Sequence, residues 1–535
     1  MRGDWKLPAA LAVLFLWAEA WQTLLPVLQN PDALPYPHLP TDHAAYLSFV
    51  RQAAEGGGPW SRNLFTTEAQ DGRFLMLTLG LVGWIHRLTS LPVPWAWHLV
   101  RLAGAAGVVL ALGGLIRALF PSRGQRLFAF ALVLFGGGLD VWVRWGASLD
   151  LWGDPGLSSW ARNPWNFSLF WNGAVLVWTW PLWILLAWIA REIRTGGEAG
   201  PGTWLVRGAL FALLFAMHPY TAIFQGLLVA FIALKDLPGT MQSDSPAGAI
   251  LRRLPVLAGP AAVALFLVWA RGDPVYRWST DQVGLWRLSY PPHLWPLACG
   301  PQVLLALAGL GRDREGERGF CWIRAWALFG VLATANPLIT GAKFQPLMIV
   351  PLGLLAARGA IRIAGRTSWG IRGRTVAGIV LVLASSSSFW AGLARDFRDP
   401  ATREVLVPLP GEREAWEALA SMPEGGVLCL PRTALWVPGQ SGQPVFVGQW
   451  FLSTRFGEKD RLVRWFYQGP ATEAQRRGFL EAAGIRYLLH GPREREALGE
   501  VPVVPGVIRR WEGPGGWTVW EVENRGAAAA DGGES

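Results

Sequence analysis

The residues whose types and spacing could support chemistry begin at Asp42, which is followed by His43 and, one helical turn later, by Tyr46. They come soon after the first long apolar segment of the chain. A short helix that begins here, with Thr41 as its cap, brings the carboxylate to the edge of that segment. There it could act as a general base toward an acceptor hydroxyl. A plain helix cap or a solvated loop acid is the alternative interpretation of the same pattern.

Further ionisable groups stand at the ends of later apolar segments. Lys343 lies near the start of one segment, the sequence His218-Pro219-Tyr220 separates two others, and Arg271 and Arg277 follow another. Lys343, Arg271 and Arg277 could stabilise a leaving group on which negative charge develops. His218 and Tyr220 could bind sugar hydroxyls or phosphate. Snorkelling of Lys343 at a helix end and a simple turn at His218 remain alternatives.

Metal and cofactor chemistry has little support in the sequence. Asp150 and Asp154 could bind a divalent cation, but two acids four residues apart in a Gly- and Pro-rich loop are usually solvated. No phosphate-binding loop, dinucleotide fingerprint or nucleophile elbow occurs in a suitable context. The three cysteines have neither disulfide-like nor zinc-like spacing. We therefore expect no cofactor and favour catalysis without a metal.

The composition predicts the frame that positions these groups. Of 535 residues, 52% are hydrophobic and 16% are charged, whereas soluble domains carry roughly 25% charged residues. The continuous apolar runs predict an all-α polytopic membrane bundle with about eleven to thirteen spans. The net charge of +10 comes largely from arginines at the ends of these runs. This distribution fits the positive-inside rule and excludes nucleic acid as an expected partner.

The arginine clusters predict the topology. The N-terminus lies inside, and the first apolar run is retained as a span although Ala18-Glu19-Ala20 resembles a signal-cleavage site. If residues 74–91 cross the membrane fully, every later loop changes sides. Three explanations stay open: this stretch lies in the interface or re-enters, one of the other predicted spans is incorrect, or the arginine cluster at 117–126 breaks the positive-inside rule. The later predicted spans are 98–117, 127–145, 172–190, 203–218, 219–235, 253–271, 295–310, 320–338, 341–358 and 373–391.

The composition changes after the last span. We therefore predict a transmembrane domain at 1–394, including a first extracytoplasmic loop at 29–73, then an extracytoplasmic α/β domain at 395–524 and a disordered tail at 525–535. Within the α/β domain, Thr472 is the expected cap of a helix that stops at Gly484. The predicted strands are 426–430, 445–448, 485–490 and 517–522.

The first loop also carries a family resemblance. Asp42-His43-Ala44-Ala45-Tyr46, then Gln52-Ala53-Ala54 and Gly56-Gly57-Gly58-Pro59-Trp60, resembles the first extracytoplasmic loop of the GT-C superfamily. These membrane glycosyltransferases use polyprenyl-phosphate sugars and include protein mannosyltransferases and lipid A aminoarabinose transferases. In them an Asp, usually followed by a second acid, precedes a Tyr and a Gly-x-Trp element. Here His43 replaces the second acid, and Gly72-Arg73-Phe74-Leu75 stands where a Pro-Pro-Leu element is often found.

The resemblance implies an inverting glycosyltransferase in which Asp42 is the catalytic base and His43 and Tyr46 contact substrate. It implies a polyprenyl-phosphate-linked sugar as donor and a lipid, glycan or protein as acceptor. The expected location is a bacterial-type cytoplasmic membrane, with membrane lipids around the bundle and the C-terminal domain outside. The alternative is a non-catalytic membrane protein, a transporter or an assembly factor for envelope polymers, that keeps the same frame.

Overall fold

The structure, a computed structural model, describes residues 6–36, 40–56, 58–136, 176–196, 200–235, 245–285, 300–311, 317–336, 341–386, 389 and 404–523. The chain divides into two compact units, each built from three separate stretches of sequence. The helical unit comprises Met1–Leu25, Trp97–Leu267 and Gly284–Arg398. The mixed unit comprises Pro26–Ala96, Val268–Val283 and Asp399–Ser535, so the first loop belongs to the same unit as the C-terminal residues.

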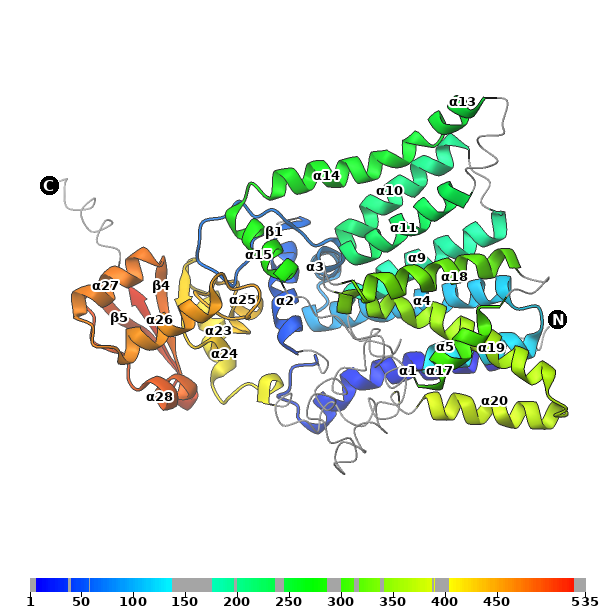
Figure 1. The fold of residues 1–535 in the computed structure, drawn as a ribbon. Helices are drawn as coiled ribbons and strands as arrows, with labels where there is room; N and C mark the ends of the chain where they lie inside the picture. Colours follow the sequence, from blue (N-terminus) through cyan, green and yellow to red (C-terminus); the bar gives the residue numbers. More distant parts are fainter. Residues whose placement is uncertain are drawn as a thin grey trace. The chain divides into compact units, whose positions relative to one another are not determined.

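The described part of the helical unit consists of apolar helices. Figure 1 shows α9, α10, α11 and α18 side by side. Leucine, alanine and valine dominate these helices, as expected where the solvent is lipid. The elements are α1 (Lys6–Gln29), α4 (Val93–Leu119), α5 (Arg123–Phe135), α9 (Leu176–Thr195), α10 (Pro201–Met217), α11 (Pro219–Lys235), α13 (Pro246–Leu251), η2 (Leu254–Leu257), α14 (Ala258–Ala270), α17 (Pro301–Gly309), α18 (Glu317–Thr334), η4 (Gly341–Met348), α19 (Ile349–Arg366) and α20 (Ile371–Ser385).

Several of these helices meet the requirements for crossing a membrane. Among the described residues, four stretches are long and apolar enough: Val93–Leu119, Leu176–Thr195, Pro246–Ala270 and Pro346–Arg366. Helix α1 adds a fifth, bent by 42° between Trp21 and Thr23. Pro26 explains the bend, because its ring clashes with the carbonyl four residues earlier. The predicted total span count includes residues outside the described ranges and stays a prediction.

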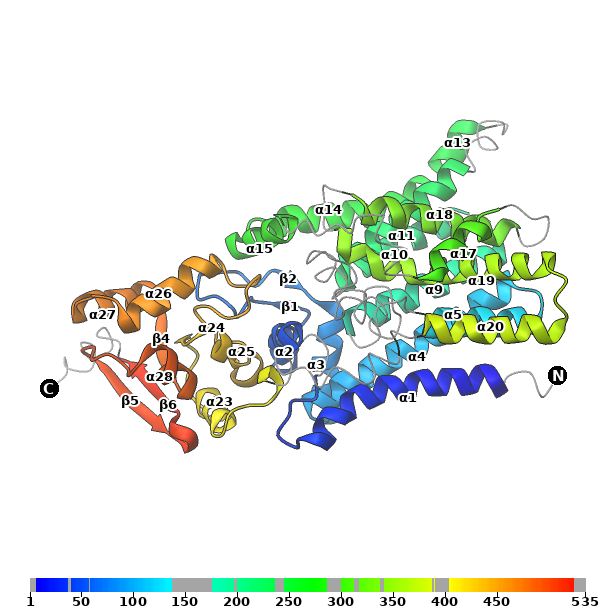
Figure 2. The same ribbon diagram turned by 60° about the horizontal axis from the view of Figure 1, so that its bottom comes forward.

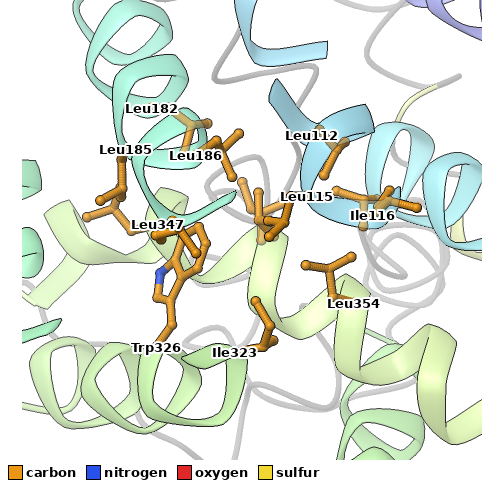
Figure 3. Packing of buried hydrophobic residues seen from close by; sticks show 14 of the residues in the cluster. Leu112, Leu115, Ile116, Leu182, Leu185, Leu186, Ile323, Trp326, Leu347 and Leu354 are labelled. Atoms are coloured by element: carbon orange, nitrogen blue, oxygen red, sulfur yellow. The ribbon is translucent and has the colours of Figure 1, made fainter. Parts of the chain in front are cut away.

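A single apolar core holds the helical unit together. Figure 3 shows side chains from α4, α9, α18, η4 and α19 pointing toward one another. Leu112 and Leu115 of α4, Leu185 of α9 and Trp326 of α18 are fully buried. Elsewhere glycine allows helices to approach: a Cβ on Gly359 of α19 would collide with the carbonyl oxygen of Leu305 in α17. Close packing through small residues is a common means of association between helices in lipid.

Two buried ion pairs also join helices of this unit. Arg101 of α4 donates to the Glu19 carboxylate of α1 at 2.7 Å, and the two side chains are 2% and 0% exposed. Arg207 of α10 donates to Glu192 of α9 at 2.6 Å, with 1% and 2% exposure. Glu19 therefore has its counter-ion within the bundle, just before the bend in α1.

The mixed unit begins with the first loop. Helix α2 (Pro40–Ala54) packs against α3 (Leu77–Thr89), and a short antiparallel pair, β1 (Trp60–Ser61) and β2 (Phe74–Leu75), lies between them in sequence. Helix α15 (Pro274–Leu285) comes from the middle of the chain. The 13 residues of α3 are fewer than the roughly 20 needed to span a bilayer. This length favours the interfacial interpretation of residues 74–91 over a full crossing.

The C-terminal part of the mixed unit is a four-stranded sheet with helices. The strands are β3 (Gly426–Leu428), β4 (Ile485–His490), β5 (Val507–Glu512) and β6 (Thr518–Val522), in the order β3-β4-β6-β5. Only the β3 and β4 pair is parallel. Figure 2 shows β5 and β6 as neighbouring strands. The helices are α23 (Glu412–Ala420), α24 (Pro431–Ala434), α25 (Val437–Ser441), α26 (Phe456–Gln468), α27 (Glu473–Ala482) and α28 (Pro492–Leu498), and a short 3-10 turn, η6 (Pro514–Gly516), precedes β6.

The helix at α27 and three of the four predicted strands in this region are confirmed, whereas strand β5 was not predicted. Thr472 caps α27 through a capping box with Gln475, and Gly484 ends the turn in the left-handed conformation at φ +66°. The predicted strand at 445–448 is wrong: Val445 makes only an isolated bridge to Val427. The Val445 amide donates to the Leu64 carbonyl of the first loop, so it is not available for a strand pair in the sheet.

Candidate active site

Asp42 lies in the first turn of α2. The helix begins at Pro40, whose fixed φ suits the first helical position. Thr41 therefore lies inside the first turn and does not cap the helix as predicted. A carboxylate in the first turn interacts favourably with the helix dipole, which stabilises its ionised form. Asp42 is half-buried, so its carboxylate retains access to a reacting group.

Tyr46 stands one turn after Asp42 on the same side of α2. Burial raises the pKa of the Tyr46 phenol well above its usual value, and the nearby Asp42 charge adds to the effect. The phenol therefore stays protonated at neutral pH and acts as a hydrogen-bond donor. Asp42 and Tyr46 together present an acceptor and a donor from one face of a rigid helix.

His43 belongs to an aromatic cluster inside the mixed unit. Its side chain is 2% exposed and stacks on Tyr36, with ring centroids 5.4 Å apart. Tyr36 in turn stacks on Trp436 at 6.1 Å, and Tyr46 meets the His43 ring edge-on at 6.5 Å. An acid at position 43 would be buried among these rings at a high desolvation cost. The cluster holds α2 in place, which favours a positioning role for His43.

The β1–β2 loop is fixed to the segment before α15. Trp60 contacts Trp269 edge-on at 5.4 Å, and Phe74 contacts Tyr276 at 5.1 Å. The guanidinium of Arg73 lies over the Trp269 ring, 4.8 Å from its centroid. These contacts attach the first loop to residues that lie about 200 positions later in the sequence.

Asp273 is a structural acid that completes this attachment. One carboxylate oxygen accepts the backbone amides of Val275 and Tyr276 at 2.8 and 3.0 Å, which caps the start of α15. The other oxygen accepts the Asp71 amide at 2.7 Å. Asp273 is fully buried, so it is engaged in holding the loop and not open to substrate.

The predicted cations Arg271 and Arg277 lie in this same segment. Arg271 is exposed and pairs with Asp281 at 2.9 Å. Arg277 is exposed on α15, and among the described residues its side chain has no ion pair. Arg277 is therefore the more available of the two for an anionic ligand.

His218, Tyr220 and Lys343 come together within the helical unit. His218 ends α10, is 7% exposed and makes a 2.8 Å hydrogen bond between Nδ1 and the Thr221 hydroxyl. Its ring lies 5.5 Å from that of Tyr220, and Tyr220 contacts Phe344 edge-on at 5.3 Å. Lys343 precedes Phe344 in η4 and lies close enough for its charge to act on His218. The three predicted residues thus form one cluster.

The predicted site residues therefore fall into two groups. Asp42, His43, Tyr46, Arg271 and Arg277 belong to the mixed unit, whereas the His218 cluster belongs to the helical unit. Asp150 and Asp154 lie outside the described residues. Within the described ranges no group of three or more His, Cys, Asp or Glu side chains is arranged to hold a metal ion.

Sequence reasoning missed one polar network that supports the first loop. Lys459 of α26 is 4% exposed at its side chain and donates to Glu68 and to the Thr66 hydroxyl, each at 2.9 Å. Burial lowers the pKa of Lys459, while Glu68 acts in the opposite direction. The Thr454 hydroxyl donates to the same carboxylate at 2.7 Å. Lysine is rare in this chain, and that rarity was the one available signal.

Comparisons of sequence give no family: no family model matches the chain, and no curated protein matches it either. Comparisons of structure do find similar folds. Arabinofuranosyltransferase AftD from Mycobacteria aligns over 96% of this chain and 42% of its own, with 18% identity and a TM-score of 0.55. The oligosaccharyltransferase of Archaeoglobus fulgidus, tethered to an acceptor peptide, aligns over 96% and 74%, with 12% identity and a TM-score of 0.46.

A second structure of the archaeal enzyme, AglB with an inhibitory peptide and a dolichol-phosphate, aligns over 90% of this chain and 70% of its own. Its identity is 12% and its TM-score is 0.43. Of the three, only AftD reaches a TM-score that indicates a shared fold, and this chain spans less than half of AftD. AftD is a GT-C superfamily member. The chain thus shares the fold of the matched part of AftD, which is the fold that the resemblance of the first loop implies. Together with the described helices that are long and apolar enough to cross a membrane, this fold indicates an integral membrane protein.

Proposed function

We propose that this protein is a membrane glycosyltransferase that transfers a sugar from a polyprenyl-phosphate donor to an extracytoplasmic acceptor with inversion. The observation that carries the proposal is the position of Asp42. It is a half-buried carboxylate in the first turn of α2, beside the protonated phenol of Tyr46, in a chain with a GT-C fold. AftD, whose fold the chain shares, is named as an arabinofuranosyltransferase.

In the proposed reaction Asp42 removes the proton of an acceptor hydroxyl. The acceptor oxygen attacks the anomeric carbon, a new glycosidic bond forms, and the bond to the phosphate oxygen breaks. The polyprenyl phosphate leaves with the bonding electrons, and cations stabilise its charge. In the mixed unit this role falls to Arg277, which is favoured over the paired Arg271. Lys343, His218 and Tyr220 form a separate candidate anion- and sugar-binding cluster in the helical unit.

The proposed topology has the N-terminus inside a bacterial-type cytoplasmic membrane and the mixed unit outside. Its support is the composition of that unit, which joins residues 26–96, 268–283 and 399–535. Segments that pack into one unit must lie on the same side of the bilayer. The 13-residue length of helix α3 supports this topology, because a helix that short falls below the roughly 20 residues needed to cross a bilayer.

The test is transfer of radiolabelled sugar by the full-length protein in proteoliposomes supplied with polyprenyl-phosphate sugars. Asp42→Asn keeps the size of the side chain and removes the base, so we expect transfer to fall by about 10²–10⁴-fold. Asp32→Asn is the matched control, because Asp32 is exposed on the same unit. Equal rates for the Asp42→Asn variant and the wild type would refute the assignment.

The same preparation separates the enzyme from the alternative of a transporter or assembly factor. Labelled solute that enters the vesicles without any glycosylated product would favour transport. Product formation that depends on Asp42 favours the transferase.

A further inference from the structure

The mixed unit contains a cavity on one face of α2. Its volume is about 350 Å³, at the lower end of the roughly 300–1,000 Å³ typical of small-molecule sites. Its lining residues come from Tyr36 before α2, from α2 and the residue after it, and from α3, the start of α4 and α25. They are Tyr36, Leu47, Arg51, Ala54, Glu55, His86, Val93, Pro94, Gly439 and Gln440. The side chain of Glu55 is 56% exposed, so the cavity opens to solvent at that residue.

This cavity lies on a different face of α2 from Asp42. At 100° per residue, Leu47, Arg51 and Ala54 share one side of a helix. Asp42 and Tyr46 share another, roughly 100–180° away. Neither Asp42 nor Tyr46 lines the cavity. A ligand bound here would therefore sit apart from the proposed base.

The polar groups of the cavity are positioned by contacts with their neighbours. Arg51 donates through Nε to Glu55 at 2.7 Å and through Nη1 to the carbonyl of Gln440. His86 Nδ1 lies 2.8 Å from the Leu91 carbonyl. A carbonyl can only accept, so Nδ1 of His86 donates to it, and Nε2 remains as the second hydrogen-bonding nitrogen of the ring.

These contacts leave both donors and acceptors for a ligand. The second guanidinium nitrogen of Arg51 can donate, and the second carboxylate oxygen of Glu55 can accept. Nε2 of His86 can form one more hydrogen bond, and the side-chain amide of Gln440 can both donate and accept. The charges of Arg51 and Glu55 cancel, so the cavity offers no net charge to an anion.

We infer that this cavity binds a neutral saccharide. Each sugar hydroxyl both donates and accepts a hydrogen bond, which matches the mixed set of polar groups. The apolar side chains of Leu47, Val93 and Pro94 can pack against the C–H face of the ring. A phosphorylated ligand is disfavoured because the Glu55 carboxylate would face its charge. This site goes beyond the proposed transferase reaction and does not depend on it.

The test is equilibrium dialysis of full-length protein in detergent micelles against tritiated methyl α-mannoside, maltotriose and arabinotriose, with glucose 6-phosphate as the charged comparison. We expect saturable binding of at least one neutral saccharide. Ala54→Trp fills the cavity and should weaken that binding by at least about tenfold. Its matched control is Ala474→Trp, at an exposed position of α27, which should bind like the wild type.

Two further variants make the outcome decisive. Glu55→Gln, at a side chain that is 56% exposed, should weaken binding by about fivefold or more. Asp42→Asn should bind saccharide like the wild type, even where it abolishes transfer, so the two proposals can fail separately. No saturable binding of any neutral probe, unchanged binding by Ala54→Trp and Glu55→Gln, or preferred binding of glucose 6-phosphate would each overturn the inference.

Discussion

The buried pair between Glu19 and Arg101 offers the sharpest test of how the helical unit is held together. Arg101 donates to the Glu19 carboxylate and to the Glu19 backbone carbonyl, both at 2.7 Å, and to the Thr23 hydroxyl at 3.0 Å. Both charged side chains are essentially inaccessible. Removing either partner leaves a charge inside the bundle without its counter-ion, which costs about 3–5 kcal/mol.

The pair also predicts strong coupling between the two positions. Glu19→Leu and Arg101→Met should each lower the free energy of unfolding by about 3–5 kcal/mol. The double variant removes both charges and should lie within about 2 kcal/mol of the wild type, because buried pairs are often replaceable by apolar residues. The coupling energy of the cycle is then at least about 4 kcal/mol, because the two single losses add to at least about 6 kcal/mol and the double variant loses at most about 2 kcal/mol.

The assay is reversible unfolding of the four proteins by sodium dodecyl sulfate in mixed micelles, followed by circular dichroism. The exposed pair Arg509 and Glu512 is the control, since it has the same 2.7 Å separation but side chains 51% and 59% exposed. Its cycle should give at most about 1 kcal/mol. A coupling energy below about 1 kcal/mol for Glu19 and Arg101 would refute the reasoning.

The remaining predictions concern local features. Burial holds the pKa of His490 below its usual value, so the unfolded chain binds a proton at this residue before the folded chain does, and stability falls as the pH is lowered below about 6.5. Between pH about 7.5 and about 5 the wild type should therefore lose more stability than His490→Gln, and equal slopes for the two proteins would contradict this. Gly359→Ala should cost about 1–3 kcal/mol of unfolding free energy because its Cβ would meet the Leu305 carbonyl. Gly365→Ala, in open space on the same helix, should be neutral or stabilise by up to about 1 kcal/mol. Similar losses for the two variants in the detergent titration would count against close packing at Gly359. Thr472→Ala should lower stability by about 1 kcal/mol through loss of the capping box, while Thr472→Ser retains it, and equal thermal unfolding of the two variants would argue against the cap.

Features set by neighbouring residues could be predicted from the sequence. The turn at His218 between α10 and α11 lies where the apolar pattern is interrupted by His218-Pro219. The start of α27 at Thr472 and its end before Gly484 follow from side-chain capping and from a left-handed turn. These signals act within one or two turns of helix, so a single sequence contains them.

Features set by distant residues could not be predicted. Asn63 donates to the carbonyl of Leu452, which lies 389 residues later, and no local pattern indicates that contact. Strand β5 was missed because Arg509 and Arg510 interrupt its apolar alternation, which an edge strand tolerates. The GT-C fold and the candidate base at Asp42 came from the resemblance of the first loop. The cavity beside Arg51 depends on how four separate elements meet.

The attachment of the first loop to the C-terminal residues has a consequence for biogenesis. Residues 61–68 emerge from the ribosome early, yet their partners are synthesised much later, as with Leu452, which lies 389 residues after Asn63. The loop around Asp42 must therefore wait, after insertion of most of the described helices, until Val445 and Lys459 have been synthesised before its surroundings are complete. A chain truncated before about residue 445 would insert its helices but leave this loop without its partners.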